Sequence, residues 1–181
     1  DTSGNSNHSN FTFANCSISN VNGTFFMAAK SSVADSIFLH KNIFTKNEGL
    51  LFSFGAEIDK KGYYNVEKLT ITNNIFNASK GQILNMLRGG NDESTMGPLL
   101  VFSNNKINDC LPINEETLIH LYGTQRSYIE KNKIENTYTG KTVIEYADAV
   151  KAQHLFRQNI LSNSGKITTN KYVQDRNNTM L

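Results

Sequence analysis

The feature that most constrains the fold of this chain is an asparagine that recurs with apolar residues at fixed distances from it. Six segments of eight residues align so that the third and eighth positions are always apolar and the sixth is asparagine in five of the six. The sixth positions are Cys16, Asn42, Asn74, Asn105, Asn132 and Asn159. Their successive spacings are 26, 32, 31, 27 and 27 residues. Repeats of roughly 20–50 residues indicate a solenoid, in which each repeat buries little by itself and must stack on its neighbours.

A glycine and a second apolar segment follow the recurring position in most repeats. The glycines are Gly23, Gly49, Gly81, Gly140 and Gly165. The second segments are residues 24–28, 50–54, 82–87, 117–122, 141–146 and, more polar, 166–170. One repeat therefore consists of a strand, an asparagine turn, a strand, a glycine turn and a strand. This order predicts an all-β chain folded as a right-handed parallel β-helix of about six coils.

The recurring asparagines predict a ladder along the axis of that helix. Stacked amides at one turn can hydrogen-bond from coil to coil and can pair the turn's backbone groups, which would otherwise be buried without partners. The predicted ladder consists of Asn42, Asn74, Asn105, Asn132 and Asn159. The rival fold is a β-sandwich or antiparallel barrel with a strand every 8–12 or so residues, and it does not explain an asparagine at one register.

Composition limits the classes of function. The net charge of +2, from 18 basic and 16 acidic residues, argues against a dedicated nucleic-acid binder and a polybasic membrane anchor. No apolar run approaches the ~18 residues of a membrane span. Cys16 and Cys110 fit neither a metal nor a redox spacing, so we expect small buried residues there.

The domain organisation follows from the repeat. Residues 1–181 form one predicted β-helix domain, and the polar segments 1–10 and 172–181 are weak candidates for the caps that solenoid ends need. We therefore expect the chain to be a segment of a longer, two-domain enzyme.

The strand after the glycine turn carries the candidate binding residues. Alternation places one row inward, comprising Phe26, Phe52, Leu84, Ile119 and Ile144. It places the next row outward, with Asn85, His120 and Glu145 on three successive coils. Arg88 and Arg126 follow two of these strands, and arginine makes bidentate contacts with carboxylates. The row is a candidate site for an anionic sugar chain; the alternative is an ordinary solvated face.

Two insertions interrupt the repeat, at residues 55–65 and 88–98, and inserted loops on a solenoid often bind ligands. In the second, Asn91, Asp92 and Glu93 could ligate calcium, although the spacing is not that of an EF-hand. The favoured interpretation is a structural loop in which Asp92 or Glu93 pairs with Arg88 or Arg126.

No nucleophile, zinc-protease or phosphate-loop motif occurs in the sequence. Several carboxylates are candidates for glycosidase chemistry, but the sequence does not place any two of them as a pair. The catalytic residues stay unassigned, and no metal site is predicted in this segment.

Three segments resemble a known family. They are residues 64–74, the run Leu87–Pro98 with Arg-Gly-Gly-Asn-Asp-Glu-Ser-Thr-Met-Gly-Pro, and residues 118–126. The first two are similar to the second, C-terminal β-helix domain of alginate lyases of polysaccharide lyase family six, relatives of chondroitinase B, and the third resembles the coil that follows. The similarity covers most of residues 11–173. The arginine–glycine run is fairly specific, whereas the asparagine repeats are generic to β-helices.

The resemblance implies a polysaccharide lyase that cleaves a poly-uronate such as alginate, of the poly-mannuronate type, by β-elimination. A base removes the C5 proton of a uronate whose carboxylate is neutralised. In the family, calcium held by asparagine and glutamate neutralises the carboxylate, a lysine is the base and an arginine the acid. These residues belong to the first β-helix domain, and no segment of this chain matches them.

The chain is therefore interpreted as the companion of an upstream catalytic β-helix domain, lining a cleft, mediating a homodimer or capping the catalytic solenoid. A stand-alone carbohydrate-binding or adhesin-like β-helix is the alternative. A lyase site built on Asn85, His120, Glu145 and Arg126 is a third hypothesis. An extracellular or periplasmic location is expected because the polymer lies outside the cell.

Overall fold

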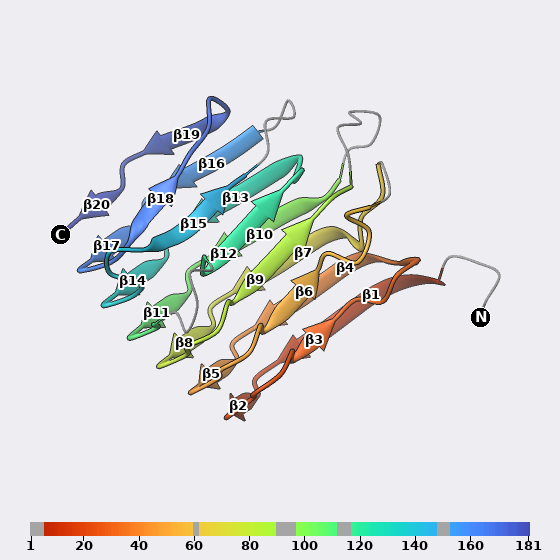
Figure 1. The fold of residues 1–181 in the computed structure, drawn as a ribbon, viewed down its shortest axis with the longest axis horizontal. Helices are drawn as coiled ribbons and strands as arrows, with labels where there is room; N and C mark the ends of the chain where they lie inside the picture. The colour runs from red at the N-terminus through yellow and green to blue at the C-terminus, as the bar shows by residue number, and fades with distance from the viewer. Residues whose placement is uncertain (1–5, 60–61, 90–96, 112–116, 148–152) are drawn as a thin grey trace.

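Three parallel β-sheets build the molecule, as seen in a computed structural model that describes residues 6–59, 62–89, 97–111, 117–147 and 153–181 (Figure 1). Sheet A contains β1 (Ser6–Ala14), β4 (Ser32–His40), β7 (Val66–Thr72), β10 (Leu99–Ser103), β13 (Arg126–Glu130), β16 (Gln153–Arg157) and β19 (Val173–Arg176). Sheet B contains β2 (Ser17–Ser19), β5 (Ile43–Thr45), β8 (Ile75–Asn77), β11 (Lys106–Asn108), β14 (Lys133–Glu135), β17 (Ile160–Ser162) and β20 (Thr179–Met180). Sheet C contains β3 (Phe26–Met27), β6 (Phe52–Phe54), β9 (Leu84–Leu87), β12 (Ile119–Tyr122), β15 (Thr142–Tyr146) and β18 (Lys166–Thr168).

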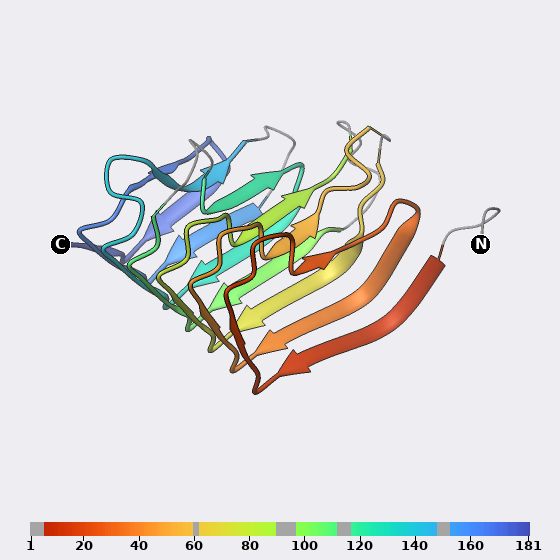
Figure 2. The same ribbon diagram turned by 60° about the horizontal axis from the view of Figure 1, so that its bottom comes forward.

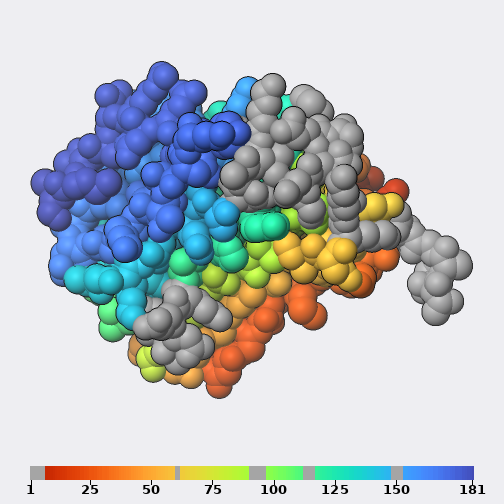
Figure 3. Space-filling view, turned by 45° about the horizontal axis from the view of Figure 1, so that its top comes forward, coloured from red at the N-terminus to blue at the C-terminus, as the bar shows by residue number. Residues whose placement is uncertain are grey.

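Each coil visits the sheets in the order A, B, C, and every strand pairs in parallel with its counterpart in the next coil. The broad strands of sheet A lie side by side in Figure 2, with β1 and β19 at opposite ends of the stack. The colours of the space-filling view run in chain order along the same axis (Figure 3). The predicted right-handed parallel β-helix is confirmed. Within the described residues no helix is long and apolar enough to cross a membrane.

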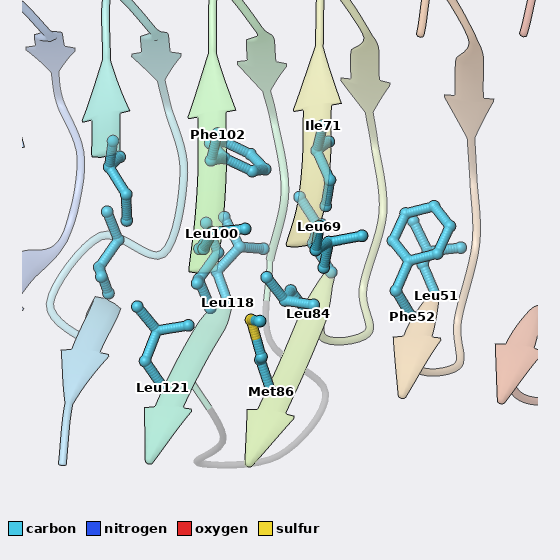
Figure 4. Packing of buried hydrophobic residues seen from close by; sticks show 14 of the residues in the cluster. Leu51, Phe52, Leu69, Ile71, Leu84, Met86, Leu100, Phe102, Leu118 and Leu121 are labelled. Atoms are coloured by element: carbon cyan, nitrogen blue, oxygen red, sulfur yellow. The ribbon is translucent and has the colours of Figure 1, made fainter. Parts of the chain in front are cut away.

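The interior is filled by rows of apolar side chains, one from each coil. In sheet C the predicted inward row is confirmed, because its members are register partners, four are buried and the first packs against the core: Phe52, Leu84, Ile119, Ile144 and the partly buried Phe26. Leu84 packs in the same core as Leu69 and Leu100 of sheet A (Figure 4). Stacking of aliphatic and aromatic side chains across three sheets supplies the apolar burial that a single coil lacks.

The asparagine ladder runs along the corner between sheets A and B. From Asn74 onward, the side-chain oxygen of each asparagine accepts hydrogen bonds from the backbone N–H and the side-chain amide of the preceding asparagine, at 2.8–3.1 Å. The oxygen of Asn42 accepts from the backbone N–H of Cys16. Each amide also donates to an inward carbonyl of the preceding coil, such as that of Ile71 for Asn105. Asn42, Asn74, Asn105, Asn132 and Asn159 are all buried, so the ladder pairs polar groups that have no access to water.

The stack has a seventh, shorter coil that the sequence pattern missed. β19 and β20 extend sheets A and B, and Asn178 adds a sixth asparagine to the ladder. The Asn178 amide donates to Asp175 Oδ1 at 2.6 Å. In the earlier coils the corresponding amide donates to the side-chain oxygen of the asparagine in the following coil. At the other end Cys16 occupies the ladder position, and its thiol donates to the Ala14 carbonyl. Cys110 is buried and Cys16 half-buried.

The recurring glycines lie where backbones of adjacent coils touch, at the corner between sheets B and C. A Cβ on Gly49 would lie 2.1 Å from the carbonyl oxygen of Gly23, closer than any real contact. Gly81 meets the carbonyl of Gly49 in the same way, at 2.2 Å. Only glycine allows this approach, which explains the glycines at positions 49 and 81, whereas an added Cβ at Gly23 or Gly140 would meet nothing within 4 Å.

Candidate functional site

The outward row of sheet C lies as a ladder of neighbouring side chains. The strand register pairs Ser53 with Asn85, Asn85 with His120, and His120 with Glu145. Strands in a sheet are about 4.8 Å apart, so these three polar side chains line a short stretch of one face. The predicted juxtaposition of Asn85, His120 and Glu145 is therefore present in the fold, and its role in binding stays a prediction.

Two of these side chains form an ion-pair geometry. His120 Nε2 lies 3.8 Å from Glu145 Oε2, and the side chains are 31% and 36% exposed. The side-chain oxygen of Asn85 is buried and has no hydrogen-bond partner within the described residues. The row thus presents an imidazole and a carboxylate on adjacent coils, beside an asparagine whose side-chain oxygen is buried.

Tyr122 belongs to the same face and was not among the predicted site residues. It lies two residues after His120 on β12, so its half-buried side chain points outward. Its register partner on β9 is Leu87. A tyrosine ring combines an apolar face with a hydroxyl, which suits contact with a sugar ring. The period of two along β12 would have identified it.

The arginines occupy different environments from those expected. Arg126 begins β13 on the outer face of sheet A, instead of lying in a loop beside sheet C. Arg88 follows β9 and its side chain is completely buried, so the expectation that it flanks an exposed row is corrected. Gly123 packs against the Cβ and carbonyl of Arg88, and the Arg88 N–H donates to the Tyr122 carbonyl at 2.9 Å. The chain turns from sheet C toward sheet A at this point.

The predicted structural loop lies outside the described residues. Asp92 and Glu93 fall in the segment 90–96, so their pairing with Arg88 or Arg126 stays a prediction. Among the residues that the structure does describe, no three histidine, cysteine, aspartate or glutamate side chains form a group able to hold a metal ion. The sheet C row contains one carboxylate, whereas calcium takes six to eight or so oxygen ligands, so the row does not fit that ion.

A groove of about 570 Å³ opens at the first coil. Apolar residues line much of it, including Phe11, Phe26 and Met27, and Lys30 and Asn65 lie at its wall. Phe11 is 40% exposed, although its register partner in the next coil, Ile37, is buried. Met27 is 70% exposed and is the register partner of Ser53 in the outward row of sheet C. The groove lies at the first-coil end of the described stack.

Comparisons with known proteins return the same family that the sequence motifs indicated. No protein-family model matches the chain, and no curated protein matches it. Among solved structures, a mutant form of the PL6 family alginate lyase AlyGC superposes with a TM-score of 0.78, at 27% identity over 91% of this chain and 24% of that chain. A second AlyGC structure gives 0.70, at 26% identity over 93% and 25%.

The fold and these matches define a PL6-like parallel β-helix domain. The predicted resemblance to the PL6 alginate lyases is confirmed over most of the chain. The chain spans about a quarter of the length of the lyase that it matches.

Proposed function

We propose that this chain is a β-helix domain of a polysaccharide lyase acting on alginate or a related poly-uronate, and that it binds the polymer without cleaving it. The observation that carries the proposal is the superposition on AlyGC over 91% of the chain at a TM-score of 0.78. The sheet C face supports a binding role, because its polar row and Tyr122 span three successive coils. An extended sugar chain can contact such a row over several residues at once.

A binding role fits the side chains better than a catalytic one. β-Elimination needs a base at C5 and a positive group on the uronate carboxylate. On the sheet C row the ionisable pair is His120 and Glu145, and Glu145 would face the negative carboxylate. We assign calcium and the catalytic lysine and arginine to another part of a longer enzyme, as the family resemblance implies.

The groove at the first coil supports an upstream partner domain. The exposed apolar side chain of Phe11 begins the interior row that continues through Ile37 and Leu69, and it would be buried if a further β-helix coil covered this end. The proposal places an upstream catalytic β-helix there; a homodimer contact is the alternative. A poly-uronate substrate also implies an extracellular or periplasmic location.

The test combines a cleavage assay with a binding titration of the 181-residue chain. Alginate, polymannuronate, polyguluronate and dermatan sulfate are each incubated with the folded chain, with and without calcium, and the ultraviolet absorbance of the unsaturated product is followed. We expect no product and saturable, salt-sensitive binding to at least one uronate polymer. Product formation would place an active site on this chain. Absence of binding to every polymer would reject the binding role.

Two variants locate the binding face. His120→Gln tests the sheet C row, and Arg126→Gln tests the outer face of sheet A, on which β13 begins. A residue that contacts the polymer loses one hydrogen bond in its variant, so affinity should fall roughly five- to tenfold, about 1–1.4 kcal/mol. Lys133→Gln is the matched control, since Lys133 is an exposed cation on sheet B. Equal losses in all three variants would mean that binding is spread over the surface and does not involve the sheet C face specifically. An adhesin-like β-helix would instead bind neutral polysaccharides as well as uronates.

A further inference from the structure

One interior row of sheet A changes from apolar to polar toward the C-terminal end. Ile37, Leu69 and Leu100 are successive partners in this row, and Ser127 and His154 continue it. All five side chains are buried. The solenoid therefore carries an imidazole in its core at the position where earlier coils carry leucine or isoleucine.

The imidazole is held by polar and aromatic contacts. His154 is 5% exposed, and its Nδ1 lies 2.8 Å from the hydroxyl oxygen of Ser127. The Tyr146 ring, from sheet C, packs against it with centroids 4.9 Å apart and an interplanar angle of 46°. On the other side, β19 pairs His154 with Val173. These contacts suit a neutral ring.

Among the residues that the structure describes, none offers the His154 ring a charge that would stabilise an imidazolium. β13 contributes Ser127, β15 contributes Tyr146 and β19 contributes Val173; no carboxylate of the described residues forms an ion pair with the ring. Asp175 on β19 is exposed, and its negative charge acts on Tyr146, whose pKa burial raises. Burial lowers the pKa of His154 to about 4 from an ordinary value of 6.5.

The coil that covers His154 contains no buried residue, and in this it resembles the first coil. Val173 is half-buried, and the other residues of β19 and both residues of β20 are exposed. β18 likewise has one half-buried residue, Ile167, between two exposed ones. Since local opening costs least where few apolar contacts form, this coil can open while the earlier coils stay stacked.

We propose that His154 makes the C-terminal segment β18–β20 an acid-released clasp. The clasp stays closed over the neutral imidazole, and protonation of the ring opens it, which exposes the imidazolium to water. The proposed binding row lies on β9, β12 and β15, outside the clasp. The chain would therefore keep this row while its C-terminal end opens in acid.

The sign and size of the effect follow from linkage. The pKa of His154 is lower in the closed state than in the open state, so the open state binds more protons below the ordinary value. The stabilisation of the closed clasp is fully present above pH 6.5 and is lost as the pH falls toward 4. For a closed-state pKa of about 4 and an open-state value of 6.5, the ratio of open to closed clasp rises about 30-fold between pH 8 and pH 5.

Hydrogen exchange of the 181-residue chain tests this clasp. Protection factors, which divide out the intrinsic exchange rate, are measured for β18 and β19 at pH 8 and pH 5, with β7 as the internal reference. We expect about 30-fold lower protection in β18 and β19 at pH 5 and little change in β7. Aspartate and glutamate of ordinary pKa stay ionised over this range, so they do not contribute.

Three variants complete the experiment. His154→Leu continues the apolar row, and His154→Gln retains a hydrogen-bonding group for Ser127; in both, the pH dependence should fall below about threefold. His40→Gln, a half-buried histidine on the outer face of sheet A, should keep the 30-fold change. A wild-type change below about threefold, a 30-fold change in His154→Gln, or equal loss of protection in β7 would each overturn the proposal.

Discussion

Two corners of the β-helix differ in almost every respect. The corner from sheet A to sheet B has two residues in each of the seven coils, and the first has a φ of 54–59° every time. The corner from sheet C to sheet A ranges from three residues, 123–125, to the insertions 55–65 and 88–98. The asparagine ladder fixes the conformation of the first corner, and its hydrogen bonds hold successive coils together. The second contains the buried Arg88 and adjoins Tyr122, and it is where variation can produce a binding surface.

The largest expected effect comes from breaking the fixed corner at its centre. The Asn105 side chain makes four hydrogen bonds, two at each end of the amide. In Asn105→Ala the N–H of Asn74 and the carbonyl of Ile71 are left buried without these partners. The free energy of unfolding should fall by roughly 3–5 kcal/mol, measured from the midpoint and slope of urea unfolding.

The neighbouring exposed Lys106 provides the control for this change. Lys106→Ala should alter the free energy of unfolding by less than about 0.5 kcal/mol. If Asn105→Ala costs less than about 1 kcal/mol, the ladder does not stabilise the scaffold as argued.

A smaller effect is expected at the corner between sheets B and C. Gly49→Ala would force a Cβ to 2.1 Å from the carbonyl of Gly23, whereas a Cβ on Gly23 meets nothing within 4 Å. Gly49→Ala should therefore lower the free energy of unfolding by about 2 kcal/mol, and Gly23→Ala by less than about 0.5. Thermal and urea unfolding of the two variants would measure the difference. Similar losses in both would show that the glycines matter for backbone freedom alone and not for the close approach.

The difference between the corners also explains what the sequence could predict. The strands, the ladder and the inward rows follow from residues that repeat from coil to coil. The fold and the Asn85–His120–Glu145 row could therefore be predicted from the sequence. The seventh coil was not, because Asp175 occupies a position that is apolar in the other coils and Asn178 follows Asn159 after only 19 residues. The burial of Arg88, whose Cβ and carbonyl lie against Gly123, occurs in one coil only and therefore leaves no trace in the repeat.

The smallest expected effect separates binding from stability on the variable side. Tyr122 and Tyr128 are both half-buried tyrosines on outer faces, Tyr122 on sheet C and Tyr128 on sheet A. Changing either to alanine removes a similar apolar contact, so the two variants should lose similar, small amounts of stability. Only Tyr122→Ala should weaken poly-uronate binding, by about three- to fivefold or roughly 0.7–1 kcal/mol.

Binding titrations with the best-bound polymer, beside urea unfolding of both variants, provide the two readouts. Because the stability change is matched, a difference in affinity reports the face and not the fold. Equal affinity in the two variants would exclude Tyr122 from the binding face. A larger loss in Tyr128→Ala would move the binding face to sheet A, where Arg126 lies beside Tyr128 on β13.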